Sequence, residues 1–325
     1  MRWKTRHALT AALAAGSLVL SGCSSEGGAQ SEADPTNVGP RLEVAMVTHA
    51  APGDTFWDIV RKGAEAAAAK DNVELLYSSD PQAGEQAQLI EAAIDQNVDG
   101  IVVSLAKPEA LAGVVRQATQ QGIPVVSINS GDTESAALGA IAHFGQNETI
   151  AGRAAGEKLN DLGYQHALCV NHEQGNVGLE ERCAGAKETF DGQMQTLFVN
   201  GEDTAQVQSS ITAQLQTSDS IDAVLALGAP FALTAVDAVE DAGSKADVAT
   251  FDMDSELINA LKAEEVKFAV DQQPYLQGYL AVDEIWLWHR NGNIVGGGQP
   301  VLTGPNIVTP DEAGQVEEFA EKGTR

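Results

Sequence analysis

An acidic residue and two adjacent aromatic residues follow the first hydrophobic segment of this sequence. Leu42–Val47 has the length and β-branched content of a buried strand, and a Pro-Gly turn then ends it. Asp54 follows the turn in a helix-capping position, and Phe56 and Trp57 begin a helix that runs to about Lys70. Ligands bind at such junctions in open parallel α/β sheets. Because sugar C–H faces stack on aromatic rings and hydroxyl groups donate to carboxylates, the combination favours a polyhydroxylated ligand.

The alternative interpretation places both aromatic rings in the hydrophobic core. A helical Phe is more often a core residue than a binding residue. However, neighbouring residues lie about 100° apart around a helix, so Phe56 and Trp57 cannot both point deep into one core. The spacing therefore favours a binding role for this pair.

The composition limits the classes of partner. The chain has 325 residues, which suggests two domains, and its 43% hydrophobic content is enough for real cores. It carries 46 acidic against 19 basic residues, a formal net charge of −27. This charge argues against binding nucleic acid and against binding an anionic membrane surface through charge. It fits a solvated exterior and a ligand that is not strongly anionic.

The first residues have the pattern of an export signal. Three basic residues precede a short hydrophobic segment, residues 8–20, which is too short for a typical spanning helix. The segment ends in Leu20-Ser21-Gly22-Cys23, which resembles the bacterial lipobox, in which the cysteine is lipidated. We therefore predict a lipoprotein signal peptide over 1–22, lipidation of Cys23 and a disordered tether over 23–40. The protein is then exported and lipid-anchored on the outer face of the cell membrane. The alternative is an ordinary signal peptide with an incidental cysteine.

Export also affects the interpretation of the two remaining cysteines. In an oxidising compartment, Cys169 and Cys183 are more often a disulfide than a metal or redox site. One cysteine ends a predicted strand and the other lies near the start of the next helix, an arrangement that allows the two to approach closely. The alternative is two buried thiols. No Cys/His cluster has zinc-site spacing, and we expect neither a metal nor a cofactor.

Strand-like and helix-like segments alternate along the rest of the chain, which predicts parallel sheets covered on both faces. The rhythm restarts after residue 145, so we expect two similar lobes with a ligand cleft between them. The predicted strands are 42–48, 73–78, 101–104, 125–128, 138–142, 167–170, 195–199, 223–227, 248–251 and 267–270, with a short hydrophobic run at 306–308. The predicted helices are 56–70, 83–96, 108–121, 148–162, 179–190, 205–216, 230–242, 255–262, 274–289 and 311–322.

Six stretches in order resemble the type I periplasmic solute-binding proteins of the ribose/galactose family, the receptors of ABC sugar importers. The resemblance covers about residues 42–308. The stretches that carry it are Gly53-Asp54-Thr55-Phe56-Trp57, Asp99–Ser104, Gly122–Asn129, Glu180–Gly185, Phe251-Asp252-Met253-Asp254 and Gln272-Gln273-Pro274.

The resemblance implies an α/β fold of two Rossmann-like lobes, joined by a multi-strand hinge with the cleft between them. The implied N-terminal lobe is 41–144 plus 274–303, and the C-terminal lobe is 145–273 plus 304–325. The implied function is a monomeric receptor that delivers a neutral monosaccharide or polyol to the membrane subunits of an ABC permease. Cleft closure, not catalysis, is the implied mechanism.

The resemblance also assigns ligand-binding residues, namely Asp54, Phe56, Trp57, Asn129, Ser130, Arg182, Asp252 and Gln272. Five further residues lie in loops on the cleft side and are weaker candidates, namely His49, His143, Asn147, His172 and Asn176. Asn129, Ser130 and Gly228 stand where the family usually has Asp, Arg (in ribose binders) and Asn. We therefore expect a hydroxyl pattern that differs from that of ribose.

Each polar candidate has a structural alternative. Arg182 could pair with Glu180 or Glu181 on the helix surface, and Asp252 could only cap a helix. Asn129 could be a turn residue, and Gln272 could bond only to the hinge backbone.

Four alternative functions stay open to different degrees. A signalling or chemotaxis receptor has the same sequence features, as does a binder of a nucleoside or a signalling furanose. A transcription regulator is disfavoured, because no helix-turn-helix precedes Leu42 and the leader directs export. An exported glycosidase could use Asp54 and Asp252 as its two carboxylates. No G-x-S-x-G, Walker A or H-E-x-x-H motif occurs in the sequence.

Overall fold

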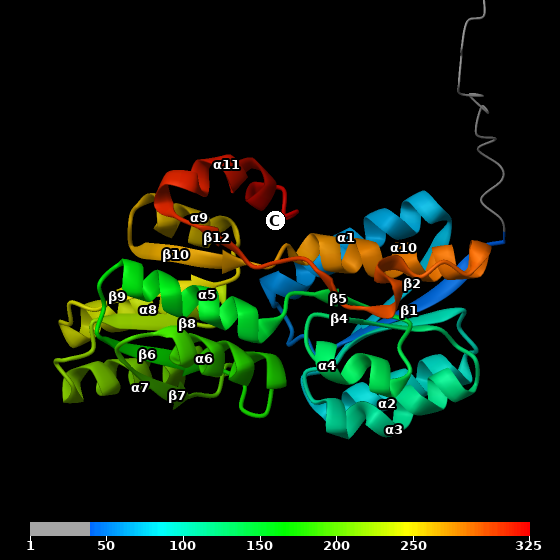
Figure 1. Ribbon diagram of the computed structural model, residues 1–325, viewed down its shortest axis with the longest axis horizontal. Helices are drawn as coiled ribbons and strands as arrows, with labels where there is room; N and C mark the ends of the chain where they lie inside the picture. Colours follow the sequence, from blue (N-terminus) through cyan, green and yellow to red (C-terminus); the bar gives the residue numbers. More distant parts are fainter. Residues whose placement is uncertain (1–39) are drawn as a thin grey trace, which may run out of the picture. The chain divides into compact units, whose positions relative to one another are not determined.

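The computed structural model describes residues 40–325. The predicted signal peptide, Cys23 and all but the last residue of the predicted tether lie outside this range. Within it, two six-stranded sheets carry the fold, and none of its helices is both long and apolar enough to cross a membrane. The predicted α/β fold of two lobes is confirmed (Figure 1).

The first sheet is entirely parallel and has the strand order β11-β5-β4-β3-β1-β2. Helices α1 and α10 cover one face, and α2 and α3 cover the other. The strands are β1 (Leu42–Thr48), β2 (Val73–Ser79), β3 (Gly100–Ser104), β4 (Val125–Ile128), β5 (Ala142–Gly145) and β11 (Val301–Leu302). The helices are α1 (Thr55–Asp71), α2 (Ala83–Asp95), α3 (Pro108–Gln120) and α10 (Pro274–Asn291), with the short α4 (Asp132–Ser135), η1 (Ala136–Leu138) and η2 (Val295–Gly298).

The second sheet has the order β12-β10-β9-β8-β6-β7, and only β12 runs antiparallel to its neighbour. Helices α5 and α6 pack on one face, and α7, α8, α9 and α11 on the other. The strands are β6 (His166–Asn171), β7 (Gln193–Phe198), β8 (Ala223–Ala226), β9 (Asp247–Phe251), β10 (Val266–Asp271) and β12 (Asn306–Val308). The helices are α5 (Glu148–Asp161), α6 (Val177–Thr189), α7 (Thr204–Thr217), α8 (Ala229–Ala242), α9 (Ser255–Lys262) and α11 (Pro310–Glu321).

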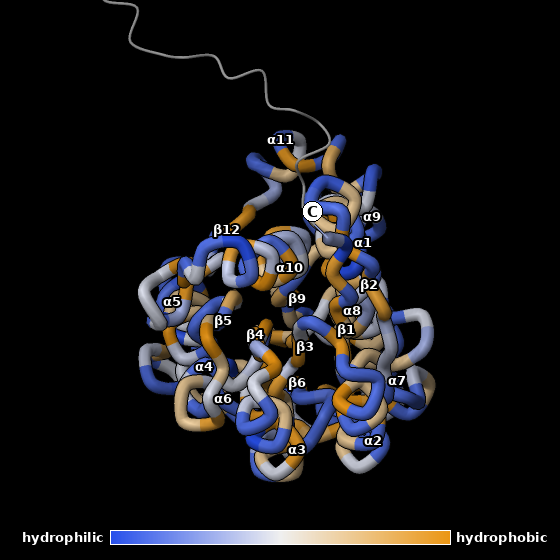
Figure 2. The backbone as a smooth tube through the Cα atoms, turned by 90° about the vertical axis from the view of Figure 1, so that its right-hand side faces the viewer, coloured by the Kyte–Doolittle hydropathy of each residue, from blue (hydrophilic) through white to orange (hydrophobic). Residues whose placement is uncertain are grey.

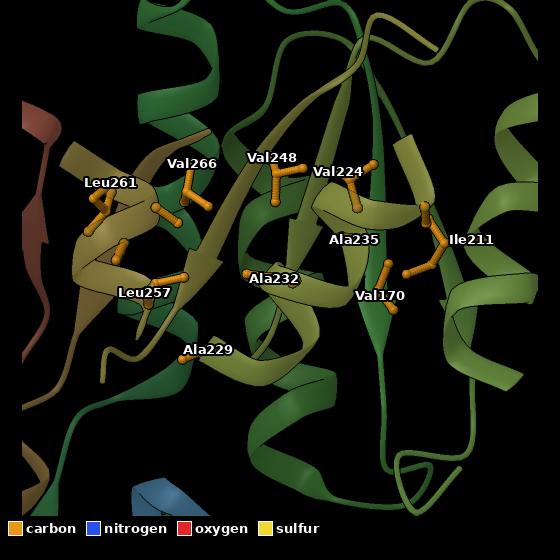
Figure 3. Close-up of a cluster of buried hydrophobic side chains, with 14 of the residues drawn as sticks. Val170, Ile211, Val224, Ala229, Ala232, Ala235, Val248, Leu257, Leu261 and Val266 are labelled. Carbon is orange, nitrogen blue, oxygen red and sulfur yellow. The ribbon is translucent and has the colours of Figure 1, made fainter. Parts of the chain in front are cut away.

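Side chains of the central strands alternate between two cores, one on each face of the sheet. In β8, Val224 and Ala226 face α7 and α8, whereas Ala223 and Leu225 face α5 and α6. Figure 3 shows the first of these cores, where labelled side chains of β6, β8, β9 and β10 face those of α7, α8 and α9. Figure 2 shows hydrophobic residues along the strands and hydrophilic residues along the outer loops. Burial on both faces explains why these strands read as continuous hydrophobic runs.

One strand was placed wrongly from the sequence. Residues 138–142 were expected to form a strand, but Leu138 ends the 3-10 helix η1 and Gly139 turns the chain at φ 91°. The strand β5 begins only at Ala142 and runs through His143 and Phe144. The sequence did not show this strand, because a polar histidine interrupts the hydrophobic pattern. In the fold, His143 is buried and hydrogen bonds to a neighbouring side chain. The two-residue edge strand β11 was also missed, since so short a segment has no periodicity.

The two cysteines form a disulfide bond between the middle of β6 and the middle of α6. The Cα atoms of Cys169 and Cys183 are 5.9 Å apart, and both residues are buried. The bond therefore fixes α6, the helix that carries Arg182, against β6, which lies between β8 and the edge strand β7.

Helices α1 and α10 approach each other closely through glycine. A side chain at Gly63 would overlap the carbonyl oxygen of Tyr275, and one at Gly278 would overlap that of Val60. We expect Gly63→Ala to lower the free energy of unfolding by about 1–3 kcal/mol, because a close-packed contact must open. Gly84→Ala in α2 is the matched control, since nothing lies within 4 Å of that site. There the change should be neutral or stabilising by up to about 1 kcal/mol. Urea unfolding of both variants measures the difference, and equal losses would contradict it.

Candidate ligand-binding site

A cavity of about 1160 Å³ lies where the carboxyl ends of the strands of both sheets meet. Eleven of the thirteen predicted ligand residues line it, namely Asp54, Phe56, Trp57, Asn129, Ser130, Arg182, Asp252, Gln272, His49, His172 and Asn176. They lie in the loops and helix starts that follow β1, β4, β6 and β9 and in the hinge segment after β10, so the topology gathers residues that lie far apart in the sequence. His143 and Asn147 do not line the cavity.

The first aromatic loop has both a structural and a cavity-lining role. Asp54 caps α1, because its Oδ1 accepts hydrogen bonds from the backbone nitrogens of Phe56 (3.0 Å) and Trp57 (3.4 Å). Trp57 is only 5% exposed and belongs to the core between the sheet and α1, whereas Phe56 is half-buried. The two rings meet edge to face at 5.2 Å. Burial raises the pKa of Asp54 to about 6.

A chain of hydrogen bonds connects the polar residues of the two lobes through the hinge. Asn129 Nδ2 donates to Gln272 Oε1 (3.2 Å), and Gln272 Nε2 donates to Asp252 Oδ1 (2.7 Å). Ser130 Oγ donates to Asn129 Oδ1 (2.9 Å). Gln277 Nε2 donates to Gln272 Oε1 (2.7 Å). The side chain of Gln272 therefore bonds to site residues and not only to the hinge backbone.

Two of these residues have an unusual backbone conformation. Asn129 and Asp252 have φ values of 65° and 64°, in the left-handed region that few non-glycine residues adopt. Such conformations cluster at ligand sites. Asp252 does not cap the following helix, because Asp254 does so through Leu257 N. The alternative of a purely capping role for Asp252 is therefore wrong.

Arg182 is held by residues that sequence reasoning did not connect to it. Its Nε and Nη2 donate to the two oxygens of Glu148 (2.7 and 2.9 Å), and its Nη1 contacts the Leu227 carbonyl (3.0 Å) and Asp252 Oδ2 (3.3 Å). All three side chains are at least nine-tenths buried. The alternative of a surface pairing with Glu180 or Glu181 is wrong. Glu148 was missed because an acidic residue in the first turn of a helix is commonplace.

Burial also raises the pKa of Asp252, to about 6, although the Arg182 guanidinium opposes the shift. The cavity therefore holds two carboxyl groups, Asp54 and Asp252, whose pKa values both lie near 6. Among residues 40–325, no group of three or more His, Cys, Asp and Glu side chains is arranged to hold a metal ion.

The weaker candidates divide into two groups. His49 and His172 line the cavity, and burial lowers the pKa of both, that of His172 to about 3. His172 stacks on Phe231 with ring centroids 3.9 Å apart. Asn176 lines the cavity but also caps α6 through Gly178 N (3.1 Å).

The other two candidates lie elsewhere. His143 hydrogen bonds to Ser127 (2.9 Å) inside the first lobe. Asn147 caps α5 through Ile150 N (2.9 Å) and donates to Asp132 (2.9 Å). Loop position alone did not separate capping asparagines from cavity residues.

The lobes also touch each other on both sides of the cavity. On one side Lys107 Nζ lies 2.8 Å from Glu173 Oε1, and Val177 N donates to Ala106 O (3.0 Å). On the other side Thr55 Oγ1 donates to Asp254 Oδ2 (3.1 Å). No sequence pattern pointed to these pairs, because each joins loops of different lobes.

Comparison with known proteins gives a consistent result. A sequence profile of the periplasmic binding protein domain matches residues 44–287. The crystal structure of a carbohydrate transporter from Acidothermus cellulolyticus, in complex with myo-inositol, is 49% identical, with a TM-score of 0.87 over 88% of this chain and 100% of that one. An ABC transporter solute-binding protein from Burkholderia graminis, in complex with D-arabinose, is 25% identical, with a TM-score of 0.74 over 83% of this chain and 96% of that one.

Curated relatives agree with the structures. The ribose import binding protein RbsB of Bacillus subtilis is 24% identical over 258 residues, which cover 77% of this chain and 83% of that protein. The two-sheet fold, the cavity between the lobes and the match over residues 44–287 lead to one conclusion. This chain belongs to the periplasmic binding protein family, a family of solute-binding proteins.

Proposed function

We propose that this protein is an exported lipoprotein that binds a neutral cyclic polyol or monosaccharide and delivers it to an ABC permease. The lipid on Cys23 anchors it at the outer face of the cell membrane. The observation that carries the ligand class is the carbohydrate transporter that matches 88% of this chain at 49% identity and was solved with myo-inositol. We therefore place an inositol-type polyol first among the candidate ligands.

The polar side chains of the cavity suit a ring that carries hydroxyl groups all around it. Asp54 and Asp252 accept hydrogen bonds from hydroxyls, and the carboxamides of Asn129 and Gln272 can both donate and accept. Arg182 presents its guanidinium from a fixed position, because Glu148 holds it by two hydrogen bonds. Phe56 and Trp57 supply an aromatic face for the C–H groups. The site binds its ligand without chemical change.

Closure of the cleft provides the transport signal. The lobe of residues 41–144 and 274–303 moves against the lobe of 145–273 and 304–325. The hinge consists of the three segments that follow β5, β10 and β11. A ligand that contacts both lobes binds the closed form better than the open form, so it shifts the equilibrium toward closure. The permease then recognises the closed form.

A thermal-shift screen tests this proposal. The chain from residue 24 onward is heated with inositols, hexoses, pentoses and linear polyols. A ligand that binds only the folded state stabilises it by about 2.7 kcal/mol at a hundredfold excess over its dissociation constant. We expect the largest rise in melting temperature with an inositol. No shift with any compound would reject the ligand class, and turnover of a glycoside would reject the non-catalytic role.

The contact between Lys107 and Glu173 is expected to favour the closed form. Because the pair joins the two lobes, it forms only on closure. Lys107→Met should raise the dissociation constant of the ligand about fivefold. This increase should be smaller at high ionic strength, because salt screens the ion pair. Lys262→Met is the matched control, since Lys262 and its partner Glu317 lie in the same lobe, on neighbouring helices that cover one face of its sheet. Isothermal titration at two ionic strengths measures the effect. An unchanged affinity for Lys107→Met, or an equal loss in the control, would contradict the prediction.

A further inference from the structure

We propose that the cavity contains a second, outer subsite that binds another sugar ring, attached to the ring held by the inner polar residues. The subsite lies between the loops that follow β2 and β7. The ligand is then a neutral two-ring compound, such as a glycoside of a cyclic polyol. This inference rests on the proposed function and specifies its substrate class further.

The size of the cavity is the first observation. Its volume of about 1160 Å³ equals the share of roughly 40 water molecules in the liquid, and it exceeds the roughly 300–1,000 Å³ of most small-molecule pockets. An open cleft would also give a large volume. However, Lys107 already contacts Glu173 on one side of the cavity, and Thr55 already contacts Asp254 on the other. Further closure is therefore limited, and a single ring leaves much of the space unfilled.

The topology places the inner and outer parts of the cavity at opposite ends. The inner residues Asn129 and Asp252 follow β4 and β9, which lie next to the strands that enter the hinge. Pro81 and Gln82 follow β2, Phe198 ends β7, and Asn200 and Gln206 follow it, and both of these strands are outer edges of their sheets. In each sheet three strand spacings of about 4.8 Å separate the two ends, or roughly 14 Å. A single ring that contacts Asp252 does not extend that far.

The outer end has the chemistry of a sugar subsite. Phe198 lines the cavity and is 49% exposed, so an aromatic surface is accessible to a ligand at this end. The exposed carboxamides of Gln82, Asn200 and Gln206 line the same cavity, and their NH₂ groups make no hydrogen bond within residues 40–325. These groups can bond to hydroxyls while the ring stacks on the aromatic face.

The charges at the outer end exclude an anionic substituent. Glu202 is exposed there, and Lys107, the cation of the other lobe that lines the cavity, is paired with Glu173. A phosphate group would meet carboxylates without a free cation to balance it. The substituent is therefore an uncharged, polyhydroxylated ring.

Isothermal titration with myo-inositol and with its monogalactosides, substituted at each hydroxyl in turn, tests the inference. We expect at least one galactoside to bind as tightly as myo-inositol or more tightly. Phe198→Ala should weaken that galactoside about tenfold while changing the affinity for myo-inositol less than about twofold. Phe319→Ala is the matched control, because Phe319 is also 49% exposed but lies on α11 and does not line the cavity. Gln206→Ala serves as a second outer variant if Phe198→Ala unfolds.

The outcomes separate the two proposals. If myo-inositol binds and every galactoside is at least tenfold weaker, the outer subsite is rejected and the proposed function stands. If the outer variants weaken both ligands equally or neither, the subsite is also rejected. If neither myo-inositol nor any galactoside binds, the inositol-type ligand is rejected, and the outer subsite with it.

Discussion

Arg182→Ala is expected to lower the free energy of unfolding by about 3–5 kcal/mol and to abolish ligand binding. The loss of stability follows from Glu148, which is 2% exposed and receives two hydrogen bonds from the guanidinium. Without Arg182 its carboxylate stays buried with no opposite charge beside it. Considered as a ligand contact alone, Arg182 could be removed with no change in the stability of the unliganded protein. The buried pair with Glu148 predicts a loss of stability instead. Urea unfolding without ligand measures the effect.

The chain offers a matched control at the surface. Arg153 also makes two hydrogen bonds to one glutamate, Glu188, but the two side chains are 45% and 55% exposed. Arg153→Ala should cost about 1 kcal/mol or less, because water replaces the lost contact. Equal losses of stability in the two variants would show that burial does not increase the contribution of the Arg182–Glu148 pair.

A double variant separates the charge from the packing. Arg182→Met combined with Glu148→Gln removes both charges and keeps most of the volume. It should recover part of the stability lost in Arg182→Ala, because residue 148 no longer carries a buried, unpaired charge, although Asp252 still loses its contact with the guanidinium. Binding should stay lost, because the guanidinium that faces the cavity is gone. Recovery of binding in the double variant would contradict the role we propose for Arg182.

The candidate site could be predicted where it depends on strand ends. Asp54, Asn129 and Asp252 each follow a buried strand closely, and parallel strands bring their carboxyl ends to one edge. The sequence shows that pattern directly. Trp57 also belongs to the core, which spacing on one helix could not show, because the depth of a side chain depends on what packs over it.

Partners from distant elements could not be predicted. Glu148 meets Arg182 only because α5 and α6 pack side by side, and Lys107 meets Glu173 only because two lobes approach. Nothing in the local sequence distinguishes these charges from solvated ones. The same limit explains β5, in which the buried His143 interrupts an otherwise hydrophobic strand.

Asp252→Asn is expected to weaken ligand binding about 100-fold, because an ionised acceptor of hydroxyl hydrogen bonds is replaced by a neutral amide. The pH dependence of the native protein gives an independent test. With the pKa of Asp252 raised to about 6, mainly by burial, its carboxylate becomes protonated as the pH falls through that value. Affinity should therefore drop about tenfold from pH 7 to pH 5. Asp54, whose pKa is also about 6, should make the drop steeper.

The unliganded protein should show the opposite trend. Between the ordinary aspartate pKa of 3.8 and about 6, the folded state binds the Asp252 proton and the unfolded state does not. This contribution to stability is therefore present at low pH and is lost as the pH rises through that window. Asp252→Asn should remove the contribution and should flatten, though not abolish, the pH dependence of binding, since Asp54 remains.

Asp247→Asn is the control for both measurements. Asp247 begins the strand that Asp252 follows, but it lies at the opposite end of β9 and does not line the cavity. Binding and its pH profile should be unchanged in that variant. If Asp252→Asn kept the native affinity and the native pH profile, Asp252 would be only a structural member of the hydrogen-bond chain that connects the two lobes through the hinge. The ligand would then be recognised by the remaining side chains of the cavity, and Asp54 would account for the whole pH dependence.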